Sequence, residues 1–122
     1  MDDAAAFDLI TAFDAIHDQA APTKVLAHIA TALRSGGTFL MVDIAGSSNL
    51  EDNAQNPMAP MFYSISTLHC MTVSLALGGE GLGTMWGEQL AVKMLNAAGF
   101  ANVNIARVEG DIMNAYYVAR KD

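Results

Sequence analysis

The stretch that decides the fold is TFLMVDI, at residues 38–44. Its apolar residues follow one another almost without interruption, a pattern typical of a β-strand covered on both faces. A second apolar run with the length of a strand, FDLITAF, lies at residues 7–13. Between them, residues 22–34 place apolar side chains at helical spacing, and the glycines after Ser35 predict the end of that helix. This order predicts a right-handed βαβ unit and therefore an α/β fold.

The rest of the chain predicts a polar loop, two helices and a hairpin. Residues 45–57 are polar, and residues 58–77 contain no Asp, Glu, Lys or Arg. Polar side chains surround this uncharged segment, so we expect a buried helix rather than a membrane span. An amphipathic helix is predicted over residues 87–98. The strands predicted at 103–108 and 113–119 are joined by a short turn, which makes them antiparallel neighbours.

Composition excludes several classes of protein. The chain has 122 residues, enough for one domain, with 52% hydrophobic and 16% charged residues, which indicates a substantial core. Its net charge of −7 argues against nucleic acid as a partner and against an electrostatic membrane surface. A single cysteine, Cys70, excludes an intrachain disulfide. The N-terminus lacks the features of a signal peptide, so we expect a cytoplasmic protein.

The ends of the two parallel strands are the first places to look for a ligand site, because open α/β sheets bind ligands beyond their carboxyl ends. One such end is the turn of residues 14–18, where His17 can exchange a proton near neutral pH. His17 could act in an active site, or His17 and Asp18 could cap the following helix. Asp43, at the end of the second strand, could position a ligand or anchor a loop.

The other residues with reactive side chains predict neither a nucleophilic pair nor a metal site. His69 and Cys70 are adjacent on a predicted helix, so their side chains diverge by about 100° and do not form a nucleophilic pair. The chain's histidines and its cysteine lack the spacing of a metal site, so no metal is expected. Trp86 could close over a ligand or belong to the core.

Several stretches together resemble one enzyme family. FDLI at 7–10, FDAIHD at 13–18, LRSGGTFL at 33–40 and AGF at 98–100 are similar to the C-terminal half of the catalytic domain of class I S-adenosylmethionine (SAM)-dependent methyltransferases. The stretches STLHC and GTMWGE, at 66–70 and 83–88, resemble a bacterial subgroup whose full-length members carry an N-terminal winged-helix domain. The resemblance spans nearly the whole of residues 1–122.

This resemblance implies a partial Rossmann-like methyltransferase fold, with helices packed on the sheet and a C-terminal antiparallel hairpin. Phe13 and Asp14 would line the methionine end of SAM. His17, as the catalytic base, would face the substrate cavity together with His69 and Trp86, and the acceptor would be a small molecule. The family's glycine-rich cofactor loop and ribose-binding acid cannot be placed in this sequence. We therefore expect a fragment that is inactive alone and binds SAM weakly or not at all.

Two other functions compete with the methyltransferase interpretation, and the sequence also predicts an assembly state. The chain could be a non-catalytic α/β binding or assembly module, or half of an oxidoreductase domain, although the terminal hairpin favours a methyltransferase. Because the family's first three strands are missing, residues 7–13 would form an apolar edge strand. We expect a homo-oligomer that buries this edge and the helix of residues 22–34.

Overall fold

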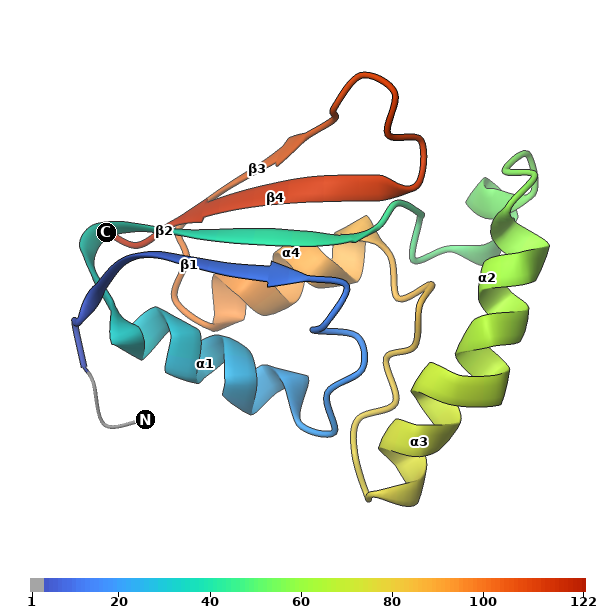
Figure 1. Cartoon of the computed structure of the whole chain (residues 1–122), viewed down its shortest axis with the longest axis horizontal. Helices are drawn as coiled ribbons and strands as arrows, with labels where there is room; N and C mark the ends of the chain where they lie inside the picture. The colour runs from blue at the N-terminus through green and yellow to red at the C-terminus, as the bar shows by residue number, and fades with distance from the viewer. Residues whose placement is uncertain (1–3) are drawn as a thin grey trace.

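The computed structural model describes residues 4–122 and has a four-stranded sheet with helices on one face and a further helical segment beside it (Figure 1). The strands β1 (Phe7–Phe13), β2 (Leu33–Ile44), β3 (Asn102–Ala106) and β4 (Asn114–Arg120) lie in the order β1-β2-β4-β3. Strands β1 and β2 are parallel, and β4 is antiparallel to both β2 and β3. The predicted α/β fold, with a parallel pair and a C-terminal hairpin, is confirmed.

Two helices, α1 (Pro22–Ala32) and α4 (Glu88–Ala97), contact each other on one face of the sheet (Figure 1). Between them and the sheet lies the main core. Its thirteen buried members are Ile16, Leu26, Ala30, Leu33, Phe39, Met41, Trp86, Ala91, Leu95, Phe100, Ala115, Tyr117 and Ala119. The rings of Phe39 and Phe100 stack with their centroids 5.9 Å apart. Alternate residues of β2 and β4 supply this core, as the pleat of a strand requires.

The opposite face of the sheet is much less covered. On β1, Leu9 is 58% exposed and Phe13 60% exposed, whereas Ile10 packs against the main core. On β2, Leu40 is only partly buried. The expectation that residues 38–44 are covered on both faces is therefore wrong for the first half of the strand. The prediction that residues 7–13 form an edge strand is confirmed.

The junction between α1 and β2 differs from the sequence-based prediction. The helix ends at Ala32 rather than at residue 34, because Leu33 adopts an extended conformation and pairs with Phe7. The side chain of Leu33 is fully buried, so this early end gains apolar burial. The glycine at position 36 is in the left-handed region, at φ 75°, and lies within β2 rather than at the end of the helix.

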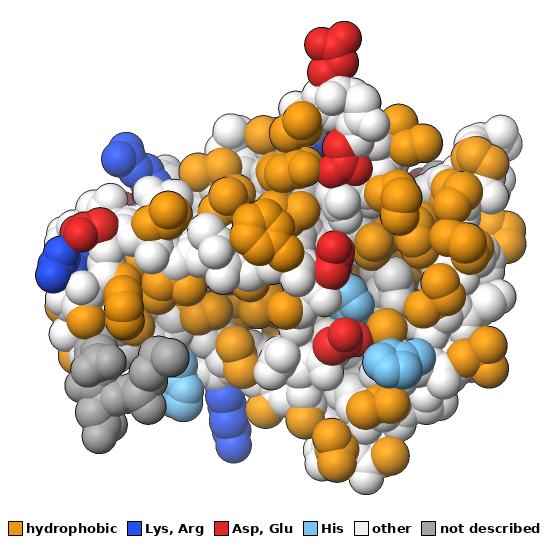
Figure 2. Space-filling view, in the orientation of Figure 1, with side chains coloured by type: hydrophobic (Ala, Val, Ile, Leu, Met, Phe, Trp, Pro, Cys, Tyr) orange, Lys and Arg blue, Asp and Glu red, His pale blue; other side chains and the backbone are white. Residues whose placement is uncertain are grey.

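The uncharged segment forms one broken helical rod that stands beside the sheet (Figure 1). A short 3-10 helix, η1 (Leu50–Asn53), precedes it; the rod consists of α2 (Ala59–Ile65), the π-helical turn η2 (Ser66–Cys70) and α3 (Met71–Ala76). The expectation of a buried helix is wrong, because only one side of the rod is buried. The large apolar side chains that are 40% exposed or more are Met61, Ile65, Leu68, Val73 and Leu75. Figure 2 shows hydrophobic side chains over this part of the surface.

The buried side of the rod differs along its length. In α2, Phe62 is 4% exposed and packs with Ile44 and Met85 in a second, small core, whereas η2 and α3 bury only small side chains. Ser66 and Ser74 face a glycine-rich segment, residues 78–87, which packs against the rod. The hydroxyl of Ser66 accepts the backbone N–H of Thr84 at 3.1 Å, and that of Ser74 accepts the N–H of Gly81 at 3.1 Å. A backbone this close leaves no room for large residues, so the large apolar side chains of η2 and α3 point outward. Within residues 4–122, no helix has the length and apolar character needed to cross a membrane.

Candidate active site

The site residues on β1 and β2 meet because the two strands are parallel and end at the same edge of the sheet. The N–H of Asp14, just past β1, donates to the carbonyl of Val42 on β2 at 2.9 Å. This contact holds the turn of residues 14–18 over the end of β2. His17 lies in that turn with 5% of its surface exposed, and Asp43 is completely buried.

His17 and Asp43 form a buried hydrogen-bonded pair. The Nδ1 atom of His17 lies 2.7 Å from Oδ1 of Asp43. The same carboxylate oxygen accepts the backbone N–H of Ile44 at 2.9 Å, so Oδ1 acts as an acceptor and Nδ1 carries the proton. When the imidazole is neutral, its lone pair is therefore on Nε2, which lies 3.4 Å from Oδ1 of Asp18. The other oxygen of Asp43, Oδ2, is buried without a hydrogen-bond partner among the described residues.

Acidic side chains tune this pair. Burial lowers the pKa of His17, but the hydrogen bond and charge of Asp43, with the charges of Asp18 and Asp14, outweigh it, so the net pKa is raised. Burial and the charge of Asp43 raise the pKa of Asp14. Asp14 also has φ 47°, a conformation that costs a non-glycine residue free energy. Strained backbone and perturbed titration at one strand end are typical of functional sites.

The helix-cap interpretation of His17 is wrong. Helix α1 begins after Ala21, and no side chain at that N-cap position makes a capping hydrogen bond. Its first turn is held instead by Glu80, whose carboxylate accepts the backbone N–H of Thr23 at 3.2 Å and the Thr23 hydroxyl at 2.6 Å. The turn containing His17 therefore does not cap helix α1. For Asp43, the interpretation as a simple loop anchor is too narrow, because its main partner is the imidazole.

The structure places the other predicted site residues in different surroundings. Phe13 ends β1 with an exposed ring next to Asp14. His69 is exposed on η2. Trp86 is only 4% exposed and belongs to the main core, between the sheet and the helices. The cofactor and substrate roles of these residues stay predictions.

One residue of the site was missed by sequence reasoning: Cys70, at the end of η2. One donor atom each from His17, Asp18 and Cys70 lies within 4.8 Å of the other two. The thiol also lies 3.2 Å from the hydroxyl of Thr84, and burial raises its pKa. From the sequence, Cys70 has only His69 as a close neighbour with a titratable side chain, and the spacing of the histidines and the cysteine does not predict a shared site. No local pattern signals the approach of a turn more than fifty residues away in the chain.

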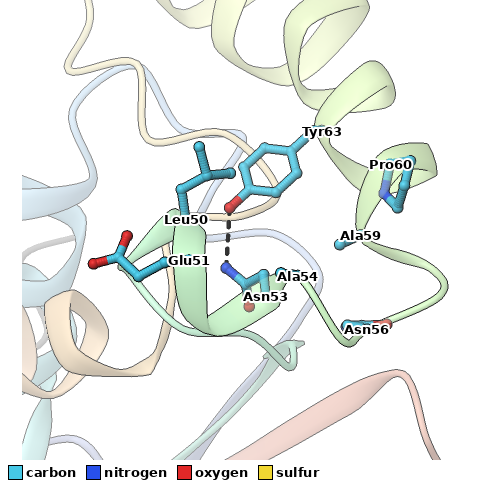
Figure 3. A pocket seen from close by; sticks show the side chains of 8 residues that line it. All are labelled: Leu50, Glu51, Asn53, Ala54, Asn56, Ala59, Pro60 and Tyr63. Atoms are coloured by element: carbon cyan, nitrogen blue, oxygen red, sulfur yellow. Dashed lines mark hydrogen bonds between the residues drawn. The ribbon is translucent and has the colours of Figure 1, made fainter.

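A separate pocket of about 290 Å³ lies between η1 and α2. Figure 3 shows its lining residues, Leu50, Glu51, Asn53, Ala54, Asn56, Ala59, Pro60 and Tyr63, none of which belongs to the His17 cluster. The amide of Asn53 donates to the Tyr63 hydroxyl at 3.0 Å and to the carbonyl of Ser47 at 2.8 Å. The polar side chain of Asn53 thus holds the loop before α2 together. The titratable side chains that could take part in catalysis lie at the sheet edge, outside this pocket.

Comparisons with solved structures decide what kind of fold this is. An O-methyltransferase family protein from Burkholderia thailandensis is 18% identical, covers 97% of this chain and 31% of its own, and superposes with a TM-score of 0.67. Human N-acetylserotonin methyltransferase, in complex with SAM, is 18% identical, with 100% and 32% coverage and a TM-score of 0.67. The trans-methyltransferase CalH, in complex with SAH, is 19% identical, with 98% and 31% coverage and a TM-score of 0.66. The chain has a methyltransferase fold.

The methyltransferase fold is supported by structure rather than by sequence similarity. No protein-family model and no curated protein matches the sequence. The chain spans about a third of the length of the methyltransferases that it superposes on. The fold class inferred from the residues and from the resemblance is confirmed.

Proposed function

We propose that this chain supplies the acceptor side of a SAM-dependent methyltransferase, with His17 as its general base. The observation that carries the proposal is the His17–Asp43 pair, 2.7 Å apart, at the carboxyl edge of the parallel strands in a methyltransferase fold. Ligands of open α/β sheets bind at this edge. The residues supply what methyl transfer to a hydroxyl or similar group requires, namely a fixed proton acceptor.

The proton transfer uses the geometry of the pair. Asp43 holds the Nδ1 proton of His17, which keeps the Nε2 lone pair available for the proton that an acceptor loses. When His17 becomes cationic, the buried carboxylate stabilises the charge because the two groups are in contact. Asp43 acts as a positioning residue, since it contacts the imidazole rather than the acceptor. A small-molecule methyl acceptor would approach from the side of Asp18, whose side chain is 41% exposed.

The residues at the end of β1 fit a cationic cofactor. Phe13 offers an exposed aromatic face and Asp14 a carboxylate beside it, and both kinds of group attract positive charge. When bound, SAM supplies an electrophilic methyl group. We propose that Phe13 and Asp14 line its methionine end, and that His69 contributes to the acceptor cavity. Trp86 would contribute from the core only after a rearrangement, because its ring is buried.

We expect this chain alone to bind SAM weakly or not at all. In Rossmann-like folds the nucleotide is held by backbone donors of a glycine-rich loop that follows the first strand, and that loop cannot be placed in this sequence. Calorimetric titration of the 122-residue chain with SAM tests this directly. We expect no heat of binding at micromolar concentrations. Micromolar affinity would contradict the proposed division of labour.

The base is tested in a methyltransferase that contains this chain. His17→Ala should lower turnover by about 10²- to 10⁴-fold, the range for a lost general base. It should also lower the melting temperature, because it leaves the buried Asp43 carboxylate without its partner. Asp43→Asn should lower turnover but leave the KM for SAM unchanged. His28→Ala is the matched control, because His28 is exposed on α1. An unchanged rate in His17→Ala would exclude the base role.

A non-catalytic assembly module is the second candidate, favoured by the exposed apolar residues of β1. We propose a cytoplasmic homo-oligomer in which this edge, with helix α1, is covered by another copy. Leu9 and Phe13 are each more than half exposed on the edge strand, and apolar strand edges promote pairing between chains. The proposal of an oligomer holds for both functions, so catalysis is what separates them.

A further inference from the structure

We propose that His17, Asp18 and Cys70 form a binding site for a borderline transition-metal ion such as Zn²⁺. Their donor atoms lie within 4.8 Å of one another. They offer an imidazole, a carboxylate and a thiol, the three ligand types that Zn²⁺ takes in proteins. Three protein ligands would leave the fourth position of a tetrahedral site open for water or another small ligand.

The spacing of the donors is close to that of a tetrahedral site. Zinc–ligand bonds of 2.0 to 2.3 Å place neighbouring donors about 3.4 to 3.6 Å apart. Nε2 of His17 and Oδ1 of Asp18 are already 3.4 Å apart. The sulfur of Cys70 would have to approach them by at most about 1.3 Å to reach that tetrahedral spacing, a shift within the range of a side-chain torsion.

A second, independent feature prepares His17 as a ligand. Its other ring nitrogen, Nδ1, is bound to the fully buried Asp43, which leaves Nε2 to face the ion. In metal-bound histidines the other ring nitrogen commonly donates to a carboxylate in this way, which fixes the ring and makes it a stronger ligand. The unpartnered Oδ2 of Asp43 adds negative charge in a buried place, which favours a cation nearby. The hydroxyl of Thr84, 3.2 Å from Cys70 Sγ, can donate to a bound thiolate.

The exposure of the three side chains suits an ion that enters the site from solvent. Asp18 has a side chain that is 41% exposed, whereas His17 and Cys70 are each about 5% exposed. An ion can therefore meet the carboxylate first and then the two buried donors. Cys70 ends the π-helical turn η2, and π-turns within helices occur frequently at functional sites.

Metal binding would compete with proton transfer. The ion needs the Nε2 lone pair of His17, and the Cys70 thiol releases its proton to solvent when the sulfur binds. An occupied site would therefore inhibit methyl transfer, and a chelator would reverse the inhibition. This consequence rests on the proposed function, whereas the binding itself does not.

The experiment titrates the full chain with Co²⁺ alone and follows its absorption spectrum. We expect a thiolate-to-cobalt charge-transfer band together with the visible bands of a tetrahedral ion. Cys70→Ser should abolish the charge-transfer band, and His17→Ala and Asp18→Asn should each weaken binding by more than about tenfold. His69→Ala, next to the cysteine, and His28→Ala are matched controls that should bind as the unchanged chain does.

A second measurement keeps the test independent of variant folding. Because Cys70 is the chain's single cysteine, the rate of its alkylation by N-ethylmaleimide reports on that sulfur alone. Added Zn²⁺ should slow alkylation of the unchanged chain, and a chelator should restore the rate. An alkylation rate independent of Zn²⁺, or cobalt bands without a charge-transfer band, would overturn the site.

Discussion

The sheet core and the η2–α3 part of the helical rod arrange their side chains in opposite ways. Under α1 and α4, the largest apolar residues, such as Phe39 and Tyr117, are buried. In the rod, Ser66 and Ser74 are buried, while Leu68 is 82% exposed. The difference lies in what packs against each element. A helix leaves a gap that large side chains fill, whereas the backbone of a glycine-rich segment lies too close for them.

The largest expected effect comes from the sheet core. Phe39→Ala should lower the free energy of unfolding by about 3 to 5 kcal/mol, because it empties a fully buried position. Leu68→Ala, on the exposed stripe of the rod, should change it by less than about 0.5 kcal/mol. Urea denaturation of both variants measures the two values. Equal losses would mean that the rod is covered in solution.

The second prediction tests the close approach of the glycine-rich segment. Gly83 has φ 72°, and a Cβ there would lie 2.0 Å from the Ser66 hydroxyl oxygen. Gly83→Ala should therefore cost more than about 2 kcal/mol, the sum of left-handed strain and a steric clash. Gly78→Ala is the matched control, because Gly78 has φ 70° but nothing within 4 Å of its Cβ position. It should cost only the strain, about 1 to 2 kcal/mol. Thermal unfolding should rank the two variants in that order.

The same two regions show what the sequence could predict. The parallel pair, α4 and the hairpin were predictable because apolar periodicity and short turns depend on local residues. The ends of the parallel strands also predicted the place of His17 and Asp43. Orientation of the rod was not predictable, since its apolar stripe is clear but the packing partner is not. Cys70 joins His17 only because the rod and the turn after β1 approach each other in space.

A third prediction asks which exposed apolar surface mediates association. We expect the β1 edge to do so, since an edge strand offers unpaired backbone groups as well as apolar side chains. Leu9→Lys should weaken self-association by at least about tenfold, or about 1.4 kcal/mol. Leu68→Lys, which puts the same charge on the rod, should leave association unchanged. Sedimentation over a range of concentrations distinguishes them, and the reverse result would assign the interface to the rod.

The smallest effect is expected at the hairpin loop between β3 and β4, whose apolar side chains are exposed; Ile112, for example, is 86% exposed. The carboxylate of Asp111 accepts the Tyr116 hydroxyl at 2.7 Å and the Met113 N–H at 3.0 Å. The hydrogen bond from Tyr116, followed by those from Asn114 and Met113, lowers the pKa of Asp111. A lowered pKa in the folded chain stabilises the loop at neutral pH, and this contribution is lost as the pH falls through the folded value. Tyr116→Phe should move the acid loss to higher pH without a large change at pH 7. Amide exchange at residues 111–114 provides the measurement, and an unchanged pH dependence would exclude Asp111 as the group that holds the loop.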